Sequence, residues 1–348
     1  MLLLKLSEAD GVSGNEGKVR ALLKEELASA TDDIWTDTLG NLFARKGKGK
    51  KPRVMVAAHM DEVGLMVVGY EKSGLLKVTK VGSVDDRVLV SKPVLVGEKC
   101  LPGVIGAKAI HLQKPGERRN ILEIENLYVD IGATSKEEAA ELVNIGDYVA
   151  FAAKPHEIGN NCLAGKAFDD RAGCAVVAEL LKEDFPLELT AVFMVQEEVG
   201  LRGSLVAAHA VHPDFALVIE GTTANDVAGV KDTGYVTKLG CGPAITIMDS
   251  SFITQKKVLN LLVNTAEKHG IPYQIRQLTT AGTDAGAISR AHEGIPAAVL
   301  SVPCRYIHSP ASIINLDDYK NTLRLAKAFL VAIAEGGLSF EETAEKIK

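Results

Sequence analysis

RVMVAAHMDEVGL, at residues 53–65, begins as an almost wholly apolar run and passes directly into an imidazole and two acids. Consecutive apolar residues, rather than alternating ones, are typical of a central strand in a parallel sheet, which is covered on both faces. The carboxyl ends of such strands meet in one crevice. We therefore predict an α/β fold in which a strand at 53–58 delivers His59 to that crevice.

Predicted helices and strands alternate, as in an α/β chain, on both sides of a central segment whose residue pattern is different. A helix is expected at 13–30, where Ser13 and Glu16 have capping-box spacing. Further helices are expected at 172–182, 204–210, 256–270 and about 316–335. Strands are expected at 33–44, 189–195, 215–219, 273–278 and 297–302.

The segment with the different texture covers residues 66–161. Short β-rich runs such as GLLKVTKVG and NLYVDIG alternate there with Gly, Pro and charged turns, which indicates a small β-barrel or sandwich. One helix is expected within it, at 135–143, with Ser135 as its N-cap. We predict that this β-rich domain is inserted into an α/β domain made of residues 1–65 and 162–348.

Composition narrows the class of protein. The chain has 348 residues, 47% of them hydrophobic, and a net charge of −6 without a basic stripe, so nucleic acid is not an expected partner. The basic run at 45–51 is interpreted as a solvated hairpin or loop. No apolar run reaches the ~18 residues of a membrane helix, so neither a membrane span nor a signal peptide is expected. Five cysteines without C-x-x-C spacing favour a reduced, cytoplasmic chain.

Acids and histidines of the kind that bind metal follow most of these apolar runs. They are His59, Asp61, Asp169, Asp170, Glu197, Glu198, Glu220 and His308. Imidazoles and carboxylates together make a good divalent-metal site. Two adjacent glutamates allow one to bind metal while the other moves a proton. The sequence therefore predicts a metal-dependent hydrolase with two metals.

Local spacing suggests separate tasks within this set, beside ordinary structural alternatives. Asp61 lies two positions after the histidine on a strand, so it faces the same side and can fix the tautomer of the ring. Asp170 can cap the following helix, the common use of such an acid, and leave Asp169 free to bind metal. Glu197 and Glu198 on their own would be an ordinary acidic turn.

Other reactive residues carry weaker signals. Cys304 could ligate metal but fits a buried thiol better. His111, within the inserted domain, is a candidate to reach the site of a neighbouring subunit. The GTDAG loop at 282–286 is expected to line a substrate pocket. Four histidines are expected at the surface near helix ends: His209, His212, His269 and His292.

Five motifs in one order resemble a known family over nearly the whole chain. HMDEVG, GKAFDDRAG, EEVGLRG, GTDAGAI and RYIHSP are similar to those of the glutamyl-aminopeptidase and TET-type aminopeptidase family of cocatalytic metallopeptidases. Some members of that family carry the older label endoglucanase M. The resemblance implies a three-layer α/β/α catalytic domain of the zinc-aminopeptidase kind, with a small β-barrel inserted into it for dimerisation.

The resemblance also implies two metal ions per subunit, most often zinc or cobalt. One metal would be held by His59, Asp169 and Glu220. The other would be held by Asp169, Glu198 and His308, with Asp169 as the bridge. Many members carry Asp at the position of Glu220, and the longer arm here bears on metal preference and substrate room.

The catalytic roles follow the same resemblance. Glu197 would be the general base and acid, and Asp61 would orient His59. The products would be free N-terminal amino acids from short peptides, and dimers would assemble into a hollow dodecamer. The chain departs from the family pattern after RYIHSP, where 311–312 reads Ala-Ser instead of a small apolar residue and an acid.

Three functions remain in competition on the sequence alone. A metal-dependent aminopeptidase is the leading hypothesis, because the ligand set is complete and in order. A β-1,4-glucanase would need two carboxyls but no histidines beside them, and only 5% of the residues are aromatic. A non-catalytic metal-bound scaffold would not require a base such as Glu197 beside the metal.

Overall fold

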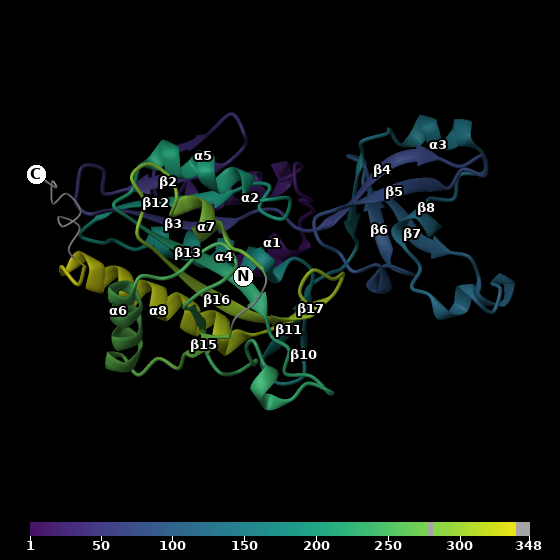
Figure 1. Cartoon of the computed structure of the whole chain (residues 1–348). Coiled ribbons are helices and arrows are strands. Elements are labelled where there is room, and N and C mark those ends of the chain that lie inside the picture. The colour runs from purple at the N-terminus through teal and green to yellow at the C-terminus, as the bar shows by residue number, and fades with distance from the viewer. Residues whose placement is uncertain (278–280, 339–348) are drawn as a thin grey trace, which may run out of the picture.

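The computed structural model describes residues 1–277 and 281–338, which form an α/β body and a β-barrel beside it (Figure 1). The helices are α1 (Leu2–Glu8), α2 (Gly17–Leu27), α3 (Lys136–Leu142), α4 (Phe168–Lys182), α5 (Arg202–Val211), α6 (Lys256–Lys268), α7 (Asp284–Ile288) and α8 (Leu316–Ala334). The strands of the body are β1 (Ile34–Thr36), β2 (Leu42–Lys46), β3 (Arg53–His59), β10 (His156–Ile158), β11 (Cys162–Gly165), β12 (Glu188–Met194), β13 (Phe215–Thr223), β14 (Ala244–Thr246), β15 (Gln274–Arg276), β16 (Ala297–Arg305) and β17 (Ser312–Asn315). The barrel strands are β4 (Gly64–Tyr70), β5 (Leu76–Val81), β6 (Pro93–Val96), β7 (Leu101–Ala107), β8 (Leu127–Asp130) and β9 (Tyr148–Phe151).

The body is built on one large mixed sheet in the order β1-β2-β12-β3-β13-β16-β17-β11-β10. Strand β3 lies in its interior and pairs in parallel with β12 and β13, and β13 pairs in parallel with β16. All seven residues of β12 are buried, as a strand covered on both faces requires. These parallel strands bring their carboxyl ends to one edge of the sheet.

Helices cover both faces of this sheet, so the predicted three-layer α/β/α arrangement is confirmed. Val54, Val56 and Ala58 of β3 belong to the core that packs against α1, α2, α4, α6 and α8. Met55 and Ala57 point the other way, into a second core shared with α5 and α7. Figure 1 shows α6 and α8 on one side of the strands and α5 on the other.

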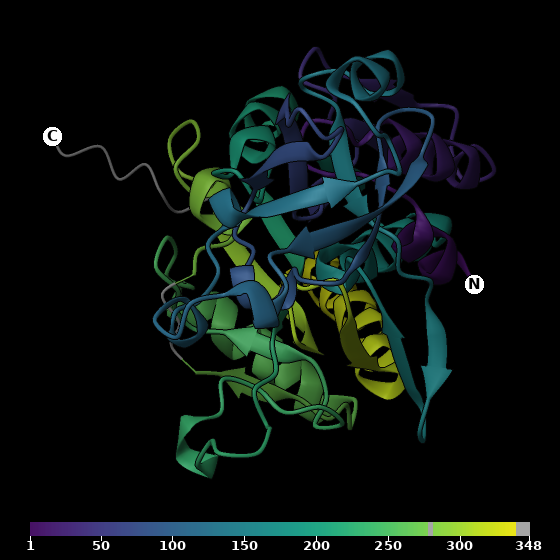
Figure 2. The ribbon, with the colours of Figure 1, turned by 90° about the vertical axis from the view of Figure 1, so that its right-hand side faces the viewer.

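The inserted strands close into a barrel in the order β4-β5-β8-β7-β6-β9, so the barrel alternative of the sequence prediction is the correct one. The barrel has its own core, which includes Leu65, Val94, Ile105 and Val149. In Figure 2 the barrel faces the viewer and the α/β body lies behind it. Strands β10 and β11, which follow the barrel in sequence, pair within the large sheet.

Some local predictions were wrong. The first long helix begins at Gly17 and not at residue 13, because the Ser13 hydroxyl donates to Asp61 instead of capping the helix. The strand expected at 33–44 is two strands, since Asp37 accepts hydrogen bonds from the backbone N–H groups of Gly40 and Asn41 and turns the chain.

The GTDAG segment, expected to be a loop, contains the start of the short helix α7. Helix α1 was not predicted at all. Leu278, at the end of the strand expected at 273–278, lies outside the described residues, and β15 ends at Arg276. Among the helices of residues 1–277 and 281–338, none combines the length and the hydropathy that crossing a membrane requires.

Candidate functional site

The strand ends bring the predicted site residues together at one edge of the large sheet. His59 is the last residue of β3, Glu197 and Glu198 follow β12, and Glu220 lies in the second half of β13. The remaining residues come from α4 and from the turn after β16: Asp169, Asp170 and His308.

A first group of oxygens surrounds the Nε2 atom of the buried His59. Asp169 Oδ1 lies 3.4 Å from it, Glu220 Oε2 3.8 Å and Glu197 Oε2 4.0 Å. Asp169 Oδ1 is itself buried and has no hydrogen-bond donor within the described residues. One imidazole nitrogen and several carboxylate oxygens within this range can hold a divalent cation between them.

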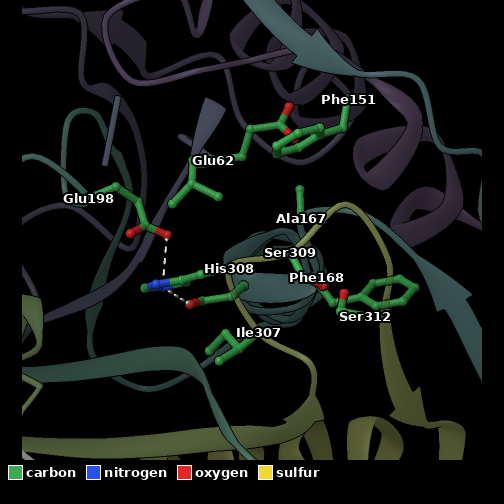
Figure 3. Close-up of a pocket in the computed structure, with 11 residues that line it drawn as sticks. Glu62, Phe151, Ala167, Phe168, Glu198, Ile307, His308, Ser309 and Ser312 are labelled. Atoms are coloured by element: carbon green, nitrogen blue, oxygen red, sulfur yellow. Dashed lines mark ion pairs between the residues drawn. The ribbon is translucent and has the colours of Figure 1, made fainter. Parts of the chain in front are cut away.

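A second group surrounds the Nε2 atom of His308. Asp169 Oδ2 lies 3.3 Å from it and Glu198 Oε1 3.2 Å, and Figure 3 shows the Glu198 carboxylate aimed at this ring. The two oxygens of Asp169 therefore face different histidines. This is the arrangement that a carboxylate bridging two cations requires.

Asp61 is completely buried and contacts both His59 and the backbone of the glutamate turn. His59 Nδ1 lies 3.2 Å from the Asp61 carbonyl oxygen and 3.5 Å from Oδ1, so it has acceptors for its proton, and Nε2 is the ring nitrogen that would bind a metal ion. Asp61 also accepts hydrogen bonds from the backbone N–H groups of Glu197 at 3.0 Å and Glu198 at 3.1 Å. Burial raises the pKa of Asp61, but these partners outweigh it and the pKa is lowered.

Asp170 has the structural role expected of it. Its Oδ1 accepts from the backbone N–H of Gly173 over 2.9 Å, which confirms it as the cap of the regular turns of α4, and its Oδ2 accepts from His59 N at 3.2 Å. The ligand atoms of His59, Asp170 and Glu220 also lie within 4.8 Å of one another. Because both oxygens of Asp170 already accept backbone hydrogen bonds, Asp169 is the better placed of the two acids to bind metal.

The site concentrates negative charge away from water. Burial, joined by repulsion between neighbouring acids, raises the pKa of Glu197 and Glu220 well above the ordinary value, and it raises the pKa of Asp284 to about 6. Burial lowers the pKa of His308, but Asp169 and Glu198 outweigh it and raise the pKa to about 11. Divalent cations would relieve this repulsion, so the residues present fit metal ions chemically.

Sequence reasoning missed the part that Asp284 plays. The GTDAG segment was expected to line a pocket, but Asp284 is fully buried at the start of α7, and its backbone N–H donates to Glu220 Oε1 over 3.3 Å. The signal was an acid within an otherwise apolar and small-residue helix. Asp284 therefore adds a further carboxylate beside the proposed ligands.

A buried ion network behind the site was also missed. Glu62 accepts from Lys166 Nζ at 2.6 Å and Arg171 Nη2 at 3.3 Å, and Arg171 Nε donates to the Met60 carbonyl over 2.7 Å. All three charged side chains are almost completely buried. The signal in the sequence was that each of them is embedded in a motif that carries site residues.

The weaker candidates lie outside this arrangement of ligands. Cys304 is buried, and burial raises the pKa of its thiol to about 12, so the neutral form is unsuited to ligate metal. His111 lies in an exposed 3₁₀ turn of the barrel, Ile110–Leu112. A pocket that includes Phe151 of the barrel opens over Glu198 and His308 (Figure 3).

Comparisons with known proteins show which family the chain belongs to. Residues 40–325 match the family model described as M42 glutamyl aminopeptidase. Lysyl aminopeptidase of Pyrococcus furiosus is 34% identical over 94% of this chain and 96% of its own length. The crystal structure of a TET aminopeptidase from a marine sediment Thaumarchaeota archaeon superposes with a TM-score of 0.93, at 36% identity over 97% of this chain and 98% of that one.

A further solved structure is that of the Pyrococcus horikoshii TET1 peptidase, which can assemble into a tetrahedron or a large octahedral shell. It is 33% identical, covers 94% of this chain and 97% of its own, and has a TM-score of 0.83. The likenesses extend over almost the full length of each chain. This chain therefore belongs to the M42 glutamyl aminopeptidase family and is a peptide hydrolase.

Proposed function

We propose that the protein is a dinuclear-metal aminopeptidase that releases N-terminal amino acids from short peptides. The observation that carries the proposal is the position of Asp169, whose two oxygens face the Nε2 atoms of His59 and His308. A site for one ion would not need a buried carboxylate divided between two imidazoles. Family membership supports the same chemistry.

The proposed ligands divide into two sets that share one acid. His59, Asp169 and Glu220 would hold one ion, and Asp169, Glu198 and His308 would hold the other. The histidines and carboxylates suit zinc or cobalt. When bound, such a pair of ions polarises the scissile carbonyl and lowers the pKa of water.

The chain's own residues would move the protons. Glu197 Oε2, 4.0 Å from His59 Nε2, lies at the edge of the ligand set and would take a proton from the attacking water and then give it to the leaving amine. Its raised pKa suits both transfers. Asp61 would orient His59 through the Nδ1 atom of that ring, and it would position Glu197 by accepting a hydrogen bond from the Glu197 backbone N–H.

The excess of acids also accounts for exopeptidase action. A peptide with a free, protonated α-amine brings a positive charge to a site rich in buried carboxylates, whereas an internal peptide bond does not. The neutral, extended backbone of a polysaccharide offers no such charge, and the histidines have no part in glycoside hydrolysis. Both points favour the aminopeptidase over the glucanase.

Glu197→Gln is the variant that tests this function. Because it removes the base and leaves the proposed ligands, we expect hydrolysis of Leu-, Glu- and Lys-anilides to fall by about 10²- to 10⁴-fold. The metal content, measured by elemental analysis, stays that of the wild type. Full activity in this variant would contradict the proposal.

Two controls complete that experiment. Glu198→Gln, at a proposed ligand, should lose metal together with activity, which separates the roles of the two adjacent glutamates. A soluble cellulose derivative should release no sugar with any metal added back. Cellulose hydrolysis without anilide hydrolysis would replace the aminopeptidase by the glucanase.

We also propose that the barrel mediates self-association toward a dodecamer. Ile110, Leu112 and Ile121 of the barrel are 69%, 64% and 60% exposed, and they lie at or beside an open groove of about 670 Å³. Several large apolar side chains exposed close together on one surface are typical of an interaction surface. The assembly of the TET1 peptidase supports the idea, and an enclosed site would admit short peptides and exclude folded proteins.

For location, we propose the cytoplasm. All five cysteines are free thiols, and none is paired within the described parts of the chain. Cys241 is exposed, so it would be open to oxidation in a secretory compartment.

A further inference from the structure

A second group of potential metal ligands lies on the surface of the body, apart from the candidate active site. Its members, called here the histidine cluster, are His209, His212, His292 and Glu293. His212 Nε2 lies 3.6 Å from Glu293 Oε2. Ligand atoms of His212, His292 and Glu293 all lie within 4.8 Å of one another. Two imidazoles and a carboxylate therefore already converge on one point.

The rings of the cluster pack against one another, and two of the residues share an uncommon backbone conformation. The centroids of His212 and His292 are 4.0 Å apart, and those of His209 and His292 are 4.4 Å apart with an edge-to-face orientation. Three imidazoles this close would repel one another if each were protonated. His212 and His292 also share a left-handed backbone conformation, with φ of +48° and +51°, which is uncommon outside glycine.

A hydrogen bond prepares His292 to act as a ligand. Its Nε2 lies 3.3 Å from the carbonyl oxygen of Ala208, which can only accept, so Nε2 carries the proton and Nδ1 keeps a free lone pair. Metal-binding histidines in proteins commonly donate their second ring nitrogen to a backbone carbonyl in this way. The contact thus fixes the tautomer that a metal requires.

The position on the helix favours a cation as well. His209 lies in the last turn of α5 and His212 is its C-cap, where the helix dipole and the last carbonyl groups are negative. Glu293 supplies a full negative charge beside them. His292 and Glu293 lie in the turn that follows α7, so the cluster joins the end of one helix to a turn elsewhere in the sequence.

The cluster is also separated from the proposed peptidase metals. Asp214, two residues after His212, donates its backbone N–H to Arg53 at the first residue of β3, whereas His59 is the last residue of that strand. Seven residues of strand span about 20 Å. The histidine cluster therefore lies near the opposite edge of the sheet from the candidate active site.

We propose that the histidine cluster binds one divalent transition-metal ion through His212, His292 and Glu293, in addition to any ions of the candidate active site. Two nitrogens and one oxygen suit zinc, nickel or copper rather than calcium or magnesium. The His209 ring packs edge-to-face against the His292 ring. The ion would join the end of α5 to the turn after α7.

Zinc counting on the whole enzyme tests this site. Wild type, His212→Ala/His292→Ala and the control His269→Ala are dialysed against micromolar Zn²⁺ and analysed for zinc per subunit. His269 is an exposed histidine at the C-cap of α6, so it matches His212 in exposure and in its position at the end of a helix, and it has no part in the histidine cluster. We expect the double variant to hold one zinc fewer per subunit than the wild type, and the control to hold the same number.

Two further readouts make the result specific. Glu293→Gln should keep the fold, measured by circular dichroism, and weaken zinc binding at this site by at least about 10-fold. Hydrolysis of anilides should be equal in all these variants, since none of them alters the candidate active site. The difference in zinc count does not depend on how many ions the active site holds. A negative result would therefore count against the histidine cluster alone and not against the proposed peptidase mechanism.

Three outcomes would overturn the proposal. One is an equal zinc count in the double variant and the wild type. Another is an equal loss in His269→Ala, which would mean that any exposed histidine binds zinc under these conditions. The third is an additional zinc that appears only at millimolar concentration.

Discussion

Ser13 and Asp61 meet beneath the candidate site although they lie far apart in sequence. The Ser13 hydroxyl donates to Asp61 Oδ2 over 2.6 Å, and both residues are buried. The same Asp61 oxygen accepts from the backbone N–H of Glu198. One serine near the N-terminus thereby helps to fix the carboxylate that holds both the histidine and the glutamate turn.

Ser13→Ala should destabilise the protein and slow catalysis. Loss of a hydrogen bond to a buried charged group costs about 1.5–3 kcal/mol, and a less well fixed Asp61 loosens its hold on His59. The measurements are urea unfolding and kcat with an anilide. Ser29→Ala, at an exposed serine whose hydroxyl donates to the Glu26 carbonyl, is the control and should change neither. A Ser13→Ala protein with wild-type stability would show that the contact is dispensable.

Sequence patterns identified the acids and histidines of the site better than the residues that support them. An acid or histidine at the end of an apolar run is visible from its neighbours alone, and His59 and Glu220 were found in that way. Ser13 and Asp284 were not, because their partners come from other elements of the fold. Ser13 even had the spacing of a helix cap, but its hydroxyl donates to the Asp61 carboxylate and does not cap the helix.

At the scale of elements, β13 passes so close to the start of α4 that it permits no side chain at Gly221. A Cβ atom placed there would lie 2.7 Å from the Cβ and Oδ1 of Asp169. The strand carries Glu220 one position earlier. The close contact between β13 and α4 thus sets the distance between two of the proposed ligands.

Gly221→Ala should therefore displace Asp169 and lower both metal content and activity. Gly17→Ala is a suitable control, because a Cβ atom there meets only the flexible Arg20 side chain at 3.8 Å and the residue is helical. Elemental analysis and anilide hydrolysis report the two effects. Normal metal content in Gly221→Ala would remove Asp169 from the ligand set.

The elements themselves were predictable where hydrophobic periodicity was strong. Consecutive apolar residues marked β3, β12, β13 and β16, and the helical spacing marked α6 and α8. The hairpin of β1 and β2 was missed because the side chain of Asp37, and not an obvious glycine-proline turn, reverses the chain. Helix α1 is short, and its stability comes from packing against α4, which no local pattern reveals.

For the whole molecule, the buried acids predict a stability that depends on metal and pH together. The pKa values of Glu197, Glu198 and Glu220 are raised by burial, and those of His59 and His308 are raised by their acid partners against the effect of burial. Each group keeps its proton in the folded state at a pH where the unfolded chain has lost it. Such groups stabilise the metal-free fold below their unfolded pKa values, about 4.3 for Glu and 6.5 for His.

Metal-free protein should thus lose thermal stability as the pH rises from about 5 to 8. Zinc or cobalt, which replaces the protons, should raise the melting temperature most at the upper end of that range. Differential scanning calorimetry of chelated and metal-loaded protein across this range measures both trends. A metal-free protein that becomes more stable with rising pH would contradict the charge balance described for the site.

Assembly gives a second prediction at this scale. Replacing Ile110, Leu112 and Ile121 together by serine should reduce the sedimentation coefficient, because the apolar surface proposed for self-association is removed. The exposed Leu205 and Val206 of α5, replaced by serine, provide the control on the body and should leave the assembly intact. An unchanged sedimentation coefficient in the barrel variant would move the interface elsewhere.

The placement of the barrel has a consequence for how the chain folds during synthesis. Both neighbours of β3 in the sheet, β12 and β13, follow the whole barrel in sequence, so β3 has neither of these partners until the barrel has been synthesised. The first and last strands of the barrel, β4 and β9, pair with each other. A barrel that folds early thus brings the end of β9 back to the start of β4, next to β3. The segments on either side of the barrel then pair across a short distance. Pairing them across a long disordered loop would cost more conformational entropy.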